Sequence, residues 1–276
     1  MLGESSLLCG RCRVITQCAK LLGLTCVLLH TNVGATRPAI DGTEAATFRS
    51  LPEAADALDK RYGYVITVET PPYVYEGDLQ DERELRNPGS LSKSTASPIM
   101  VAKEVPLSLN LPLAATVDRV AVSAIVKQLA QNGSKSDHGA HFRVEQAGDV
   151  FHIIPTEVRD ATGNWVAHTP LFDTPISIST KERSMLDTVQ AVCDALGAAN
   201  HVSVRLLVYP LNTLHYANST VGASNEVARS VLTRALTGLD RKLTWRVFYD
   251  IPMNSYLLSI LFVQDRTPSV GVPPLH

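Results

Sequence analysis

The sequence repeats one pattern four times: a helical segment with apolar periodicity, then a glycine, then a β-rich stretch. The glycines are Gly63, Gly133, Gly197 and Gly238. Because glycine readily adopts the left-handed conformation that ends many helices, the pattern predicts four helices that each end at their glycine. Short helices that alternate with β-rich runs and tight turns predict an α+β fold.

Serine-to-glutamate spacings predict where two of these helices begin. Ser50 and Glu53 match a capping box, in which the serine side chain accepts a backbone hydrogen bond and the glutamate reaches back. The first helix should therefore start near residue 51 and lead into a strand at 64–68. The same spacing recurs at Ser179 and Glu182, which predicts the start of the third helix.

The second and fourth units resemble each other most closely, because each has a helix, a strand, a tight turn and a second strand. Phe142-Arg143-Val144 stands where Trp245-Arg246-Val247 stands. The first and third units also match. We therefore predict two tandem copies of a small βαββαβ-type module, the first over 46–156 and the second over 170–264. The glycine spacings are uneven, which argues against a solenoid.

Each copy needs leading strands before its helices. In the first copy, 99–111 has this character before the second helix, whereas the segment 46–48 is a poor strand candidate. In the second copy, 171–178 and the weaker 213–221 are the expected leading strands.

Two segments lack the composition of a packed element. Residues 76–98 run acidic and then rich in serine and threonine, so we expect a mobile loop or a functional excursion there. Residues 265–276 contain three prolines and predict a flexible tail.

Residues 1–35 have the organisation of a secretory signal peptide. Arg11, Arg13 and Lys20 precede the apolar run 21–29, and small side chains stand before an expected cleavage after Ala35. The alternative is a leader retained as an anchor. Export predicts a periplasmic or secreted protein, and no later segment is long and apolar enough to predict a transmembrane span in the mature chain.

Charge and cysteine usage narrow the function classes. The leader holds three of the 25 Lys and Arg and one of the 27 Asp and Glu, which leaves a formal charge of −4 on the rest. Mild acidity argues against a nucleic-acid partner. Four of the five cysteines lie in the leader, and Cys193 falls on an apolar helical stripe, which predicts a buried packing thiol rather than a nucleophile.

No motif in the sequence predicts catalytic residues or a cofactor. Nucleophile elbows, zinc-protease helices, phosphate loops and dinucleotide-binding glycines are all missing from it. His138 and His141 are the nearest approach to a metal pair, but they follow a polar helix-to-strand connection. A solvated loop is therefore favoured over a metal site.

Three residues around a proline pair are candidates for binding. Glu69, Tyr73 and Tyr75 lie on or beside the segment stiffened by Pro71 and Pro72. Tyrosine offers a large contact area at low entropic cost, so this segment is a candidate contact surface. The alternative is packing at the end of a strand.

The second copy resembles the short N-terminal domain of secretins and TonB-dependent receptors. The resemblance rests on 175–178, a helix, Leu206-Leu207-Val208, and Trp245-Arg246-Val247, with Val231-Leu232 and Ala235-Leu236 at the place of that family's second-helix motif. The first copy matches more loosely. The resemblance implies a βαββαβ module in the cell envelope that contacts proteins or peptides through a sheet edge.

The sequence therefore predicts an exported bacterial envelope protein that acts as a non-catalytic protein- or peptide-binding module. The main alternative is a secreted hydrolase or metalloenzyme that uses His138 and His141, and a purely structural envelope role is a third. The partner expected is an envelope protein or peptide of unknown identity.

Overall fold

The computed structural model describes residues 42–83, 98–114, 117–135 and 139–263. Helices and strands alternate through it, and parallel and antiparallel strands mix in its sheets, which confirms the α+β class. The leader 1–35 with its expected cleavage after Ala35, His138, residues 84–97 of the expected loop, and the tail 265–276 lie outside the described residues.

The described chain has two halves joined by a short connection. The first half contains β1 (Thr43–Phe48), α1 (Leu51–Tyr62), β2 (Val65–Glu69), η1 (Glu76–Asp78), β3 (Leu79–Asp81), β4 (Met100–Ala102), β5 (Leu107–Pro112), α3 (Arg119–Lys135), β6 (Ala140–Ala147) and β7 (Val150–Arg159). The connection contains β8 (Trp165–Ala167) and η3 (Leu171–Asp173). The second half contains β9 (Pro175–Ile178), β10 (Arg183–Ser184), α4 (Met185–Asn200), β11 (Ser203–Leu206), α5 (Leu211–Tyr216), β12 (Asn218–Ser219), β13 (Ala223–Val227), α6 (Ala228–Thr237), β14 (Leu243–Asp250) and β15 (Ser255–Phe262).

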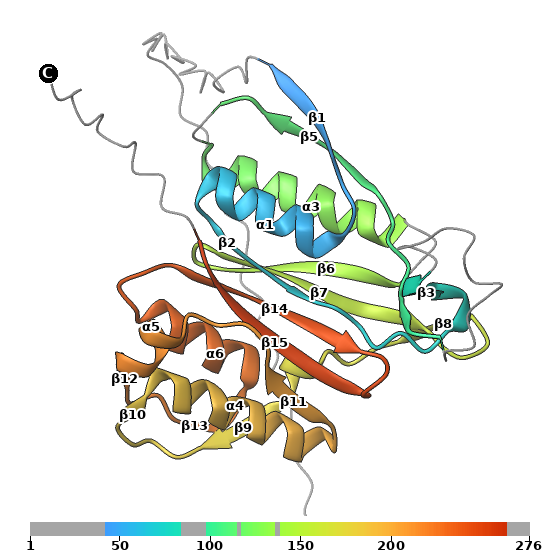
Figure 1. Ribbon diagram of the computed structural model, residues 1–276. Coiled ribbons are helices and arrows are strands. Elements are labelled where there is room, and N and C mark those ends of the chain that lie inside the picture. The colour runs from blue at the N-terminus through green and yellow to red at the C-terminus, as the bar shows by residue number, and fades with distance from the viewer. Residues whose placement is uncertain (1–41, 84–97, 115–116, 136–138, 264–276) are drawn as a thin grey trace, which may run out of the picture. The chain divides into compact units, whose positions relative to one another are not determined.

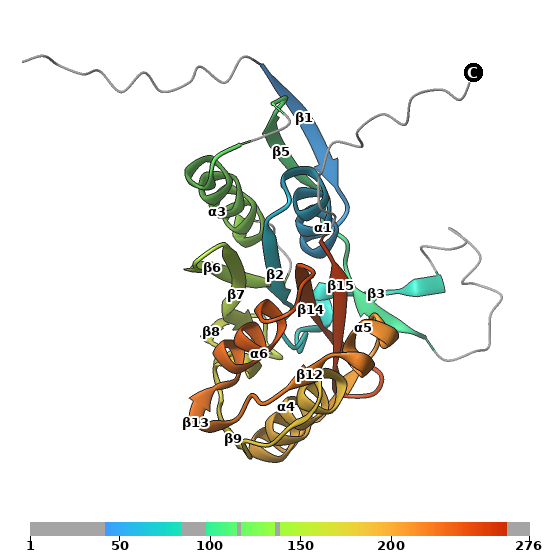
Figure 2. The same cartoon turned by 90° about the vertical axis from the view of Figure 1, so that its left-hand side faces the viewer.

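A central sheet runs through both halves in the order β11-β15-β14-β2-β7-β6, with β8 also paired to β7. The helices of the two halves lie on opposite faces of this sheet (Figure 1). Helices α1 and α3 lie between the sheet and the β1–β5 ribbon, and α4 and α6 lie between the sheet and the β9–β13 ribbon (Figures 1 and 2). Each half therefore covers one face of its own part of the sheet.

The strands of the two halves pair in the same way. In each half a leading strand pairs antiparallel with the strand before the second helix, β1 with β5 and β9 with β13. The strand after the first helix then pairs parallel with the last strand of a hairpin, β2 with β7 and β11 with β15. The order of elements is thus shared, while descent from one duplicated module stays a hypothesis.

Each half builds its own hydrophobic core. The core of the first half is drawn from residues 51–153, and that of the second from residues 171–260. In α6, Val231, Leu232, Ala235 and Leu236 are all buried, which is the stripe that helical periodicity predicts. Burial of apolar area at about 25 cal/mol per Å² makes these two cores the main stabilising contribution to the fold.

Ser50 caps the first helix as predicted, although Glu53 accepts the N–H of Arg49 rather than that of Ser50, and the second predicted box does not form. Ser50 Oγ accepts the Glu53 N–H at 3.3 Å, and Glu53 reaches back to the Arg49 N–H. The predicted box at Ser179 and Glu182 is wrong. Helix α4 begins at Met185, and Ser184 caps it by accepting the Asp187 N–H at 3.0 Å. The strand β10 consists of Arg183 and the capping residue Ser184, so the backbone is extended up to the cap and the helix cannot start earlier.

Two of the four predicted helix ends are wrong. Gly63 has φ +68° and closes α1, and α6 stops at Thr237 just before Gly238. Helix α3, however, continues past Gly133 to Lys135. Helix α4 continues past Gly197, and His201 takes the left-handed position instead.

Gly197 is explained by close packing rather than by helix termination. A Cβ atom at this position would lie 2.9 Å from the carbonyl oxygen of Val202. The absence of a side chain therefore lets the chain turn back against the helix and enter β11.

Alanine substitutions at two glycines should separate these roles. Gly63→Ala forces a side chain into the left-handed region and should lower the free energy of unfolding by about 1 kcal/mol. Gly133→Ala is the matched control, because Gly133 is helical and an added Cβ would meet Phe142 at an ordinary 3.5 Å. It should be neutral or stabilising. Urea unfolding of both variants measures the difference, and equal losses would contradict it.

The leading strands differ from expectation in four places. The segment 171–178 begins as the 3-10 helix η3, and only 175–178 forms a strand, β9. The predicted strand 213–221 is wrong for most of its length, because Leu214 packs into the core from the helix α5, only β12 is extended, and the leading strand is β13. The poor candidate at 46–48 belongs to a real strand, β1, since cross-strand partners in β5 stabilise it. The segment 99–111 divides into β4 and β5.

Candidate functional site

Glu69 lies in the interior, at the junction of the two halves. Its Oε2 accepts a hydrogen bond from Arg229 Nη2 at 3.0 Å, and its Oε1 accepts the Phe172 N–H at 3.3 Å. Burial raises the pKa of Glu69, while Arg229 opposes that rise. The side chain is 1% exposed, so the structure does not place Glu69 on a contact surface.

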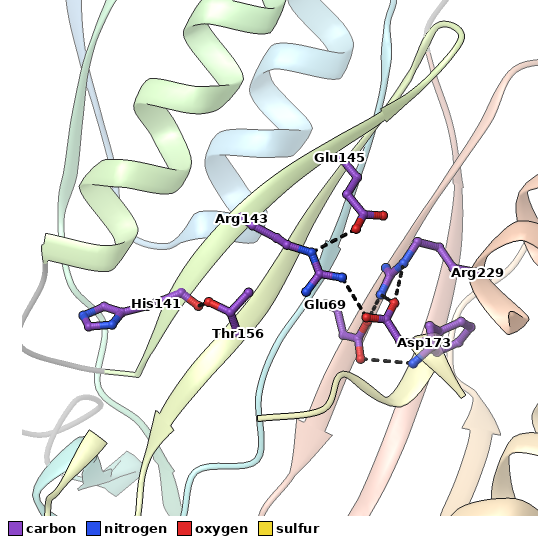
Figure 3. A network of polar contacts seen from close by, with 8 residues as sticks. Glu69, His141, Arg143, Glu145, Thr156, Asp173 and Arg229 are labelled. Atoms are coloured by element: carbon purple, nitrogen blue, oxygen red, sulfur yellow. Dashed lines mark hydrogen bonds and ion pairs between the residues drawn. The ribbon is translucent and has the colours of Figure 1, made fainter. Parts of the chain in front are cut away.

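Alternating charges extend this contact toward β6, as Figure 3 shows. Arg229 also donates to Asp173 at 2.8 Å, and Arg143 donates to the other oxygen of Asp173 at 2.7 Å and to Glu145 at 2.9 Å. Burial alone would raise the pKa of Asp173, but hydrogen bonds from the two arginines hold it below the ordinary value. The row of charges ties α6 of the second half to β2 and β6 of the first.

A second buried ion pair lies on the other side of the junction. Arg246 Nη2 donates to Asp59 at 2.7 Å and to Asp56 at 2.8 Å, and its Nη1 donates to the carbonyl oxygen of Ile66. Burial raises the pKa of Asp59 to about 7, although Arg246 and the Ile66 N–H act in the opposite direction. These contacts fasten β14 against α1 and β2, so their evident role is structural.

His152 is a neutral histidine buried at the same junction. Its Nδ1 lies 2.7 Å from Thr67 Oγ1, and burial and then the charge of Arg229 lower its pKa to about 3. The histidine therefore stays neutral in the folded protein while the unfolded chain takes up a proton below pH 6.5.

This difference should appear as a loss of stability in mild acid. Because the unfolded state binds the extra proton, His152 should lower the free energy of unfolding by about 2 kcal/mol as the pH falls from 7 to 5. Denaturant unfolding of the wild type and of His152→Gln at both pH values isolates the effect, since the other titrating groups are common to both. A parallel pH dependence of the two proteins would contradict it.

Tyr73 and Tyr75 do not form one shared surface. Tyr73 lines a cleft of about 280 Å³ together with Phe142 and Tyr249, and burial raises the pKa of Tyr73 to about 12. Tyr75 packs instead beneath the guanidinium of Arg159, whose carbon lies 5.6 Å from the ring centroid. Tyr73 therefore remains a candidate for contact with a small apolar group, and Tyr75 has a packing role.

The His141 side chain contacts residues of the two neighbouring strands β7 and β8. Its Nδ1 lies 2.6 Å from Glu157 Oε2, and its ring stacks on Trp165 with 4.0 Å between centroids. Within the residues that the structure describes, no group of three or more His, Cys, Asp or Glu side chains is arranged to hold a metal ion.

Cys193 is buried in the second core, as predicted. Burial raises the pKa of its thiol to about 12, so the nucleophilic thiolate is strongly disfavoured.

The outer edge of β11 is the feature that sequence analysis did not locate. The Leu207 N–H donates to the carbonyl oxygen of Leu258 on β15. Because backbone groups alternate along a strand, the N–H groups of Val204 and Leu206 face away from the sheet. No strand of the described chain pairs with this side of β11.

Helix α4 and exposed apolar side chains border this edge. A hollow of about 400 Å³ lies between α4 and the strand, lined by Leu186, Asp187, Gln190, Arg205, Leu206 and Tyr209. Leu207 and Val208 follow with 52% and 53% of their surface exposed, and Leu211 is similarly exposed. Unpaired backbone donors beside a groove and apolar side chains are the features that bind an extended peptide.

The sequence contains only part of the information needed to locate the outer edge of β11. The sequence predicts a strand over 202–209, and the apolar run Leu206-Leu207-Val208 breaks the alternation of a half-buried strand. Nothing local shows that β11 ends the sheet, because that depends on pairing with β15.

Comparison with known proteins gives no relative for this chain: no family model, no curated protein and no solved structure matches it. Among the helices of the described residues, none combines the length and apolar character needed to cross a membrane.

Proposed function

We propose that this chain is an exported, non-catalytic binding module that takes an extended segment of a partner protein or peptide onto the edge of β11. The observation that carries the proposal is the combination of outward backbone N–H groups, the α4 groove and exposed Leu207 and Val208. The partner would add a strand to the sheet, so backbone hydrogen bonds supply affinity and side-chain pockets supply specificity.

The side chains at the edge define the kind of segment that fits. Leu207, Val208 and Leu211 offer apolar contacts, whereas Arg205 and Asp187 border the hollow with opposite charges. A segment with β-branched or aromatic residues on one face and polar residues on the other matches this arrangement. β11 itself is only four residues long, which favours moderate affinity and reversible binding.

Two further observations support the envelope setting. The leader anatomy predicts export, and the only cysteine that follows the leader is buried in the core. Each half also has a leading strand, two long helices and a closing hairpin, with the short helix α5 added in the second half, and this is the pattern on which the resemblance to secretin and TonB-dependent receptor domains rests.

Selection from a random peptide library followed by hydrogen exchange tests the site. Peptides that bind should slow exchange at the Val204 and Leu206 amides, and Leu207→Lys should weaken binding about tenfold or more because a charge on an edge opposes pairing. Val120→Lys is the matched control, since Val120 is 77% exposed on α3. Protection elsewhere, or unchanged binding by Leu207→Lys, would overturn the proposal.

A further inference from the structure

The chain already contains one sheet junction of the kind that an added strand would make. β14 of the second half pairs parallel with β2 of the first, with Arg246 opposite Val68 and Val247 opposite Glu69. The Thr70 N–H donates to the Val247 carbonyl oxygen at 2.9 Å, and the Tyr249 N–H donates to Thr70 Oγ1 at 3.0 Å. These contacts join an outer strand of one half to an outer strand of the other.

The strand registers identify the equivalent positions in the two halves. The β2–β7 pair begins with Val65 opposite Val150, and the β11–β15 pair begins with Ser203 opposite Ser255. Each pair spans four matched positions in all. In the hairpins, Arg143 opposite Ile154 corresponds to Arg246 opposite Ser259. β11 therefore takes the place of β2, and β6 takes the place of β14.

Both equivalent edges lack a strand partner within the described chain, although one N–H at the start of β6, that of Phe142, donates to Ser134 Oγ at 2.8 Å. β2 is covered by β14, but the corresponding side of β11 has no strand partner among the described residues, and neither has the outer side of β6. The parallel junction between β14 and β2 thus occurs once inside the chain. The two strand edges that could form the same junction again, those of β6 and β11, lie at the two ends of the sheet.

Strand direction allows the junction to repeat. Three neighbouring strands in the middle of the sheet, β7, β2 and β14, run parallel to one another. At one end β6 is antiparallel to β7. At the other end β15 is antiparallel to β14, and β11 is parallel to β15. β6 and β11 of one chain therefore point the same way. A second copy in the same orientation would place its β6 parallel to β11, as β14 is to β2.

Charge at the open edges follows the internal junction in part. Arg143, which pairs with Asp173 and Glu145 in its own chain, holds the position of Arg246, which pairs with Asp59 and Asp56 on α1. Counting back from the left-handed residues Gly63 and His201, which close α1 and α4, the position of Asp59 corresponds to Gly197 and that of Asp56 to Asp194 on α4. Asp194 is exposed, and this correspondence makes it the acidic side chain that an arginine of the next copy would approach.

From this correspondence we infer that copies of this chain associate head to tail, with the β6 edge of one copy paired in parallel to the β11 edge of the next. The inference rests on the proposed function, because it names a second copy of this chain as the occupant of the β11 edge. A heterologous contact of this kind does not close on itself with two chains, so it produces an open row.

Two edge variants and their mixture test this arrangement in sedimentation velocity with the full chain. Leu207→Lys blocks the β11 edge. Gln146→Pro removes the backbone N–H that corresponds to that of Tyr249, and proline is tolerated where an edge N–H faces solvent. The wild type should form larger species as concentration rises, and each variant alone should be monomeric. The mixture should form a 1:1 dimer, because each variant retains the edge that the other lacks.

Val120→Lys should associate like the wild type, and melting temperature and circular dichroism check that each variant is folded. If Gln146→Pro does not fold, Gln146→Lys replaces it. A wild type that is monomeric at every concentration, or a single-edge variant that associates like the wild type, would overturn the inference. If library peptides still protect Val204 and Leu206 in a monomeric wild type, the proposed function stands and only the second copy is excluded. If neither library peptides nor a second copy of the chain binds the β11 edge, both the proposed function and this inference are wrong.

Discussion

Arg246→Met is expected to lower the free energy of unfolding by about 3–5 kcal/mol, because it leaves a buried carboxylate without its partner. Arg246 and Asp59 are both almost wholly buried, and their nitrogen and oxygen lie 2.7 Å apart. Asp59 loses the charge that opposes its desolvation, and the Ile66 carbonyl oxygen loses a donor. Denaturant unfolding at neutral pH measures the loss.

Two further variants make this result specific. Arg246→Met combined with Asp59→Asn should recover most of the loss, because the buried charge is removed while an acceptor for the Ile66 N–H remains. Arg49→Met applies the same substitution to an exposed ion pair with Glu53 and should change stability by about 0.5 kcal/mol or less. A large loss at Arg49, or no recovery in the double variant, would contradict the assignment of the cost to Asp59.

Trp245→Ala should be about as destabilising, at roughly 3–5 kcal/mol, because it empties the centre of the junction. Trp245 is 1% exposed, its ring stacks on Phe172 with 5.0 Å between centroids, and the Arg229 guanidinium lies over it at 5.9 Å. Loss of the indole removes both a core side chain and the surface on which that arginine rests.

Trp165→Ala is the matched control, since the chain has two tryptophans and Trp165 is 37% exposed. Its removal takes away the stack with His141 but leaves no buried cavity, so the loss should stay below about 1 kcal/mol. Urea unfolding followed by circular dichroism compares the two variants. Equal losses would mean that Trp245 does not occupy the core position that the structure gives it.

Local patterns were enough to predict most helices and hairpins. Each helix buries a single apolar face, as α6 does with Val231 and Leu232, so helical periodicity is preserved in the sequence. The tight turns predicted in the second and fourth units also form, at Gly148 between β6 and β7 and near Asn254 between β14 and β15. The residues at which helices begin were harder to predict. The spacing of Ser179 and Glu182 suggests a helix cap, but Ser184 and Asp187 have the same spacing and form the actual cap of α4.

The candidate site depended on contacts between distant parts of the chain. Glu69 looked like a surface residue beside two prolines, yet it pairs with Arg229, 160 positions later. In the same way, the strand at 202–209 was predictable, but its place at the end of the sheet follows from pairing with β15. A short stretch of sequence does not show which distant residues or strands its own residues will contact.

The carboxylates at β2 also constrain which strand can pair there. Glu69 is the last residue of β2 and Asp59 contacts the strand from α1, and the arginine partners of these two acids come 160 and 187 residues later in the chain. Charged side chains at an open strand edge discourage pairing with other chains. The acids that are costly to bury in the finished protein therefore favour β14, whose half supplies Arg229 and Arg246, over any other strand at this edge.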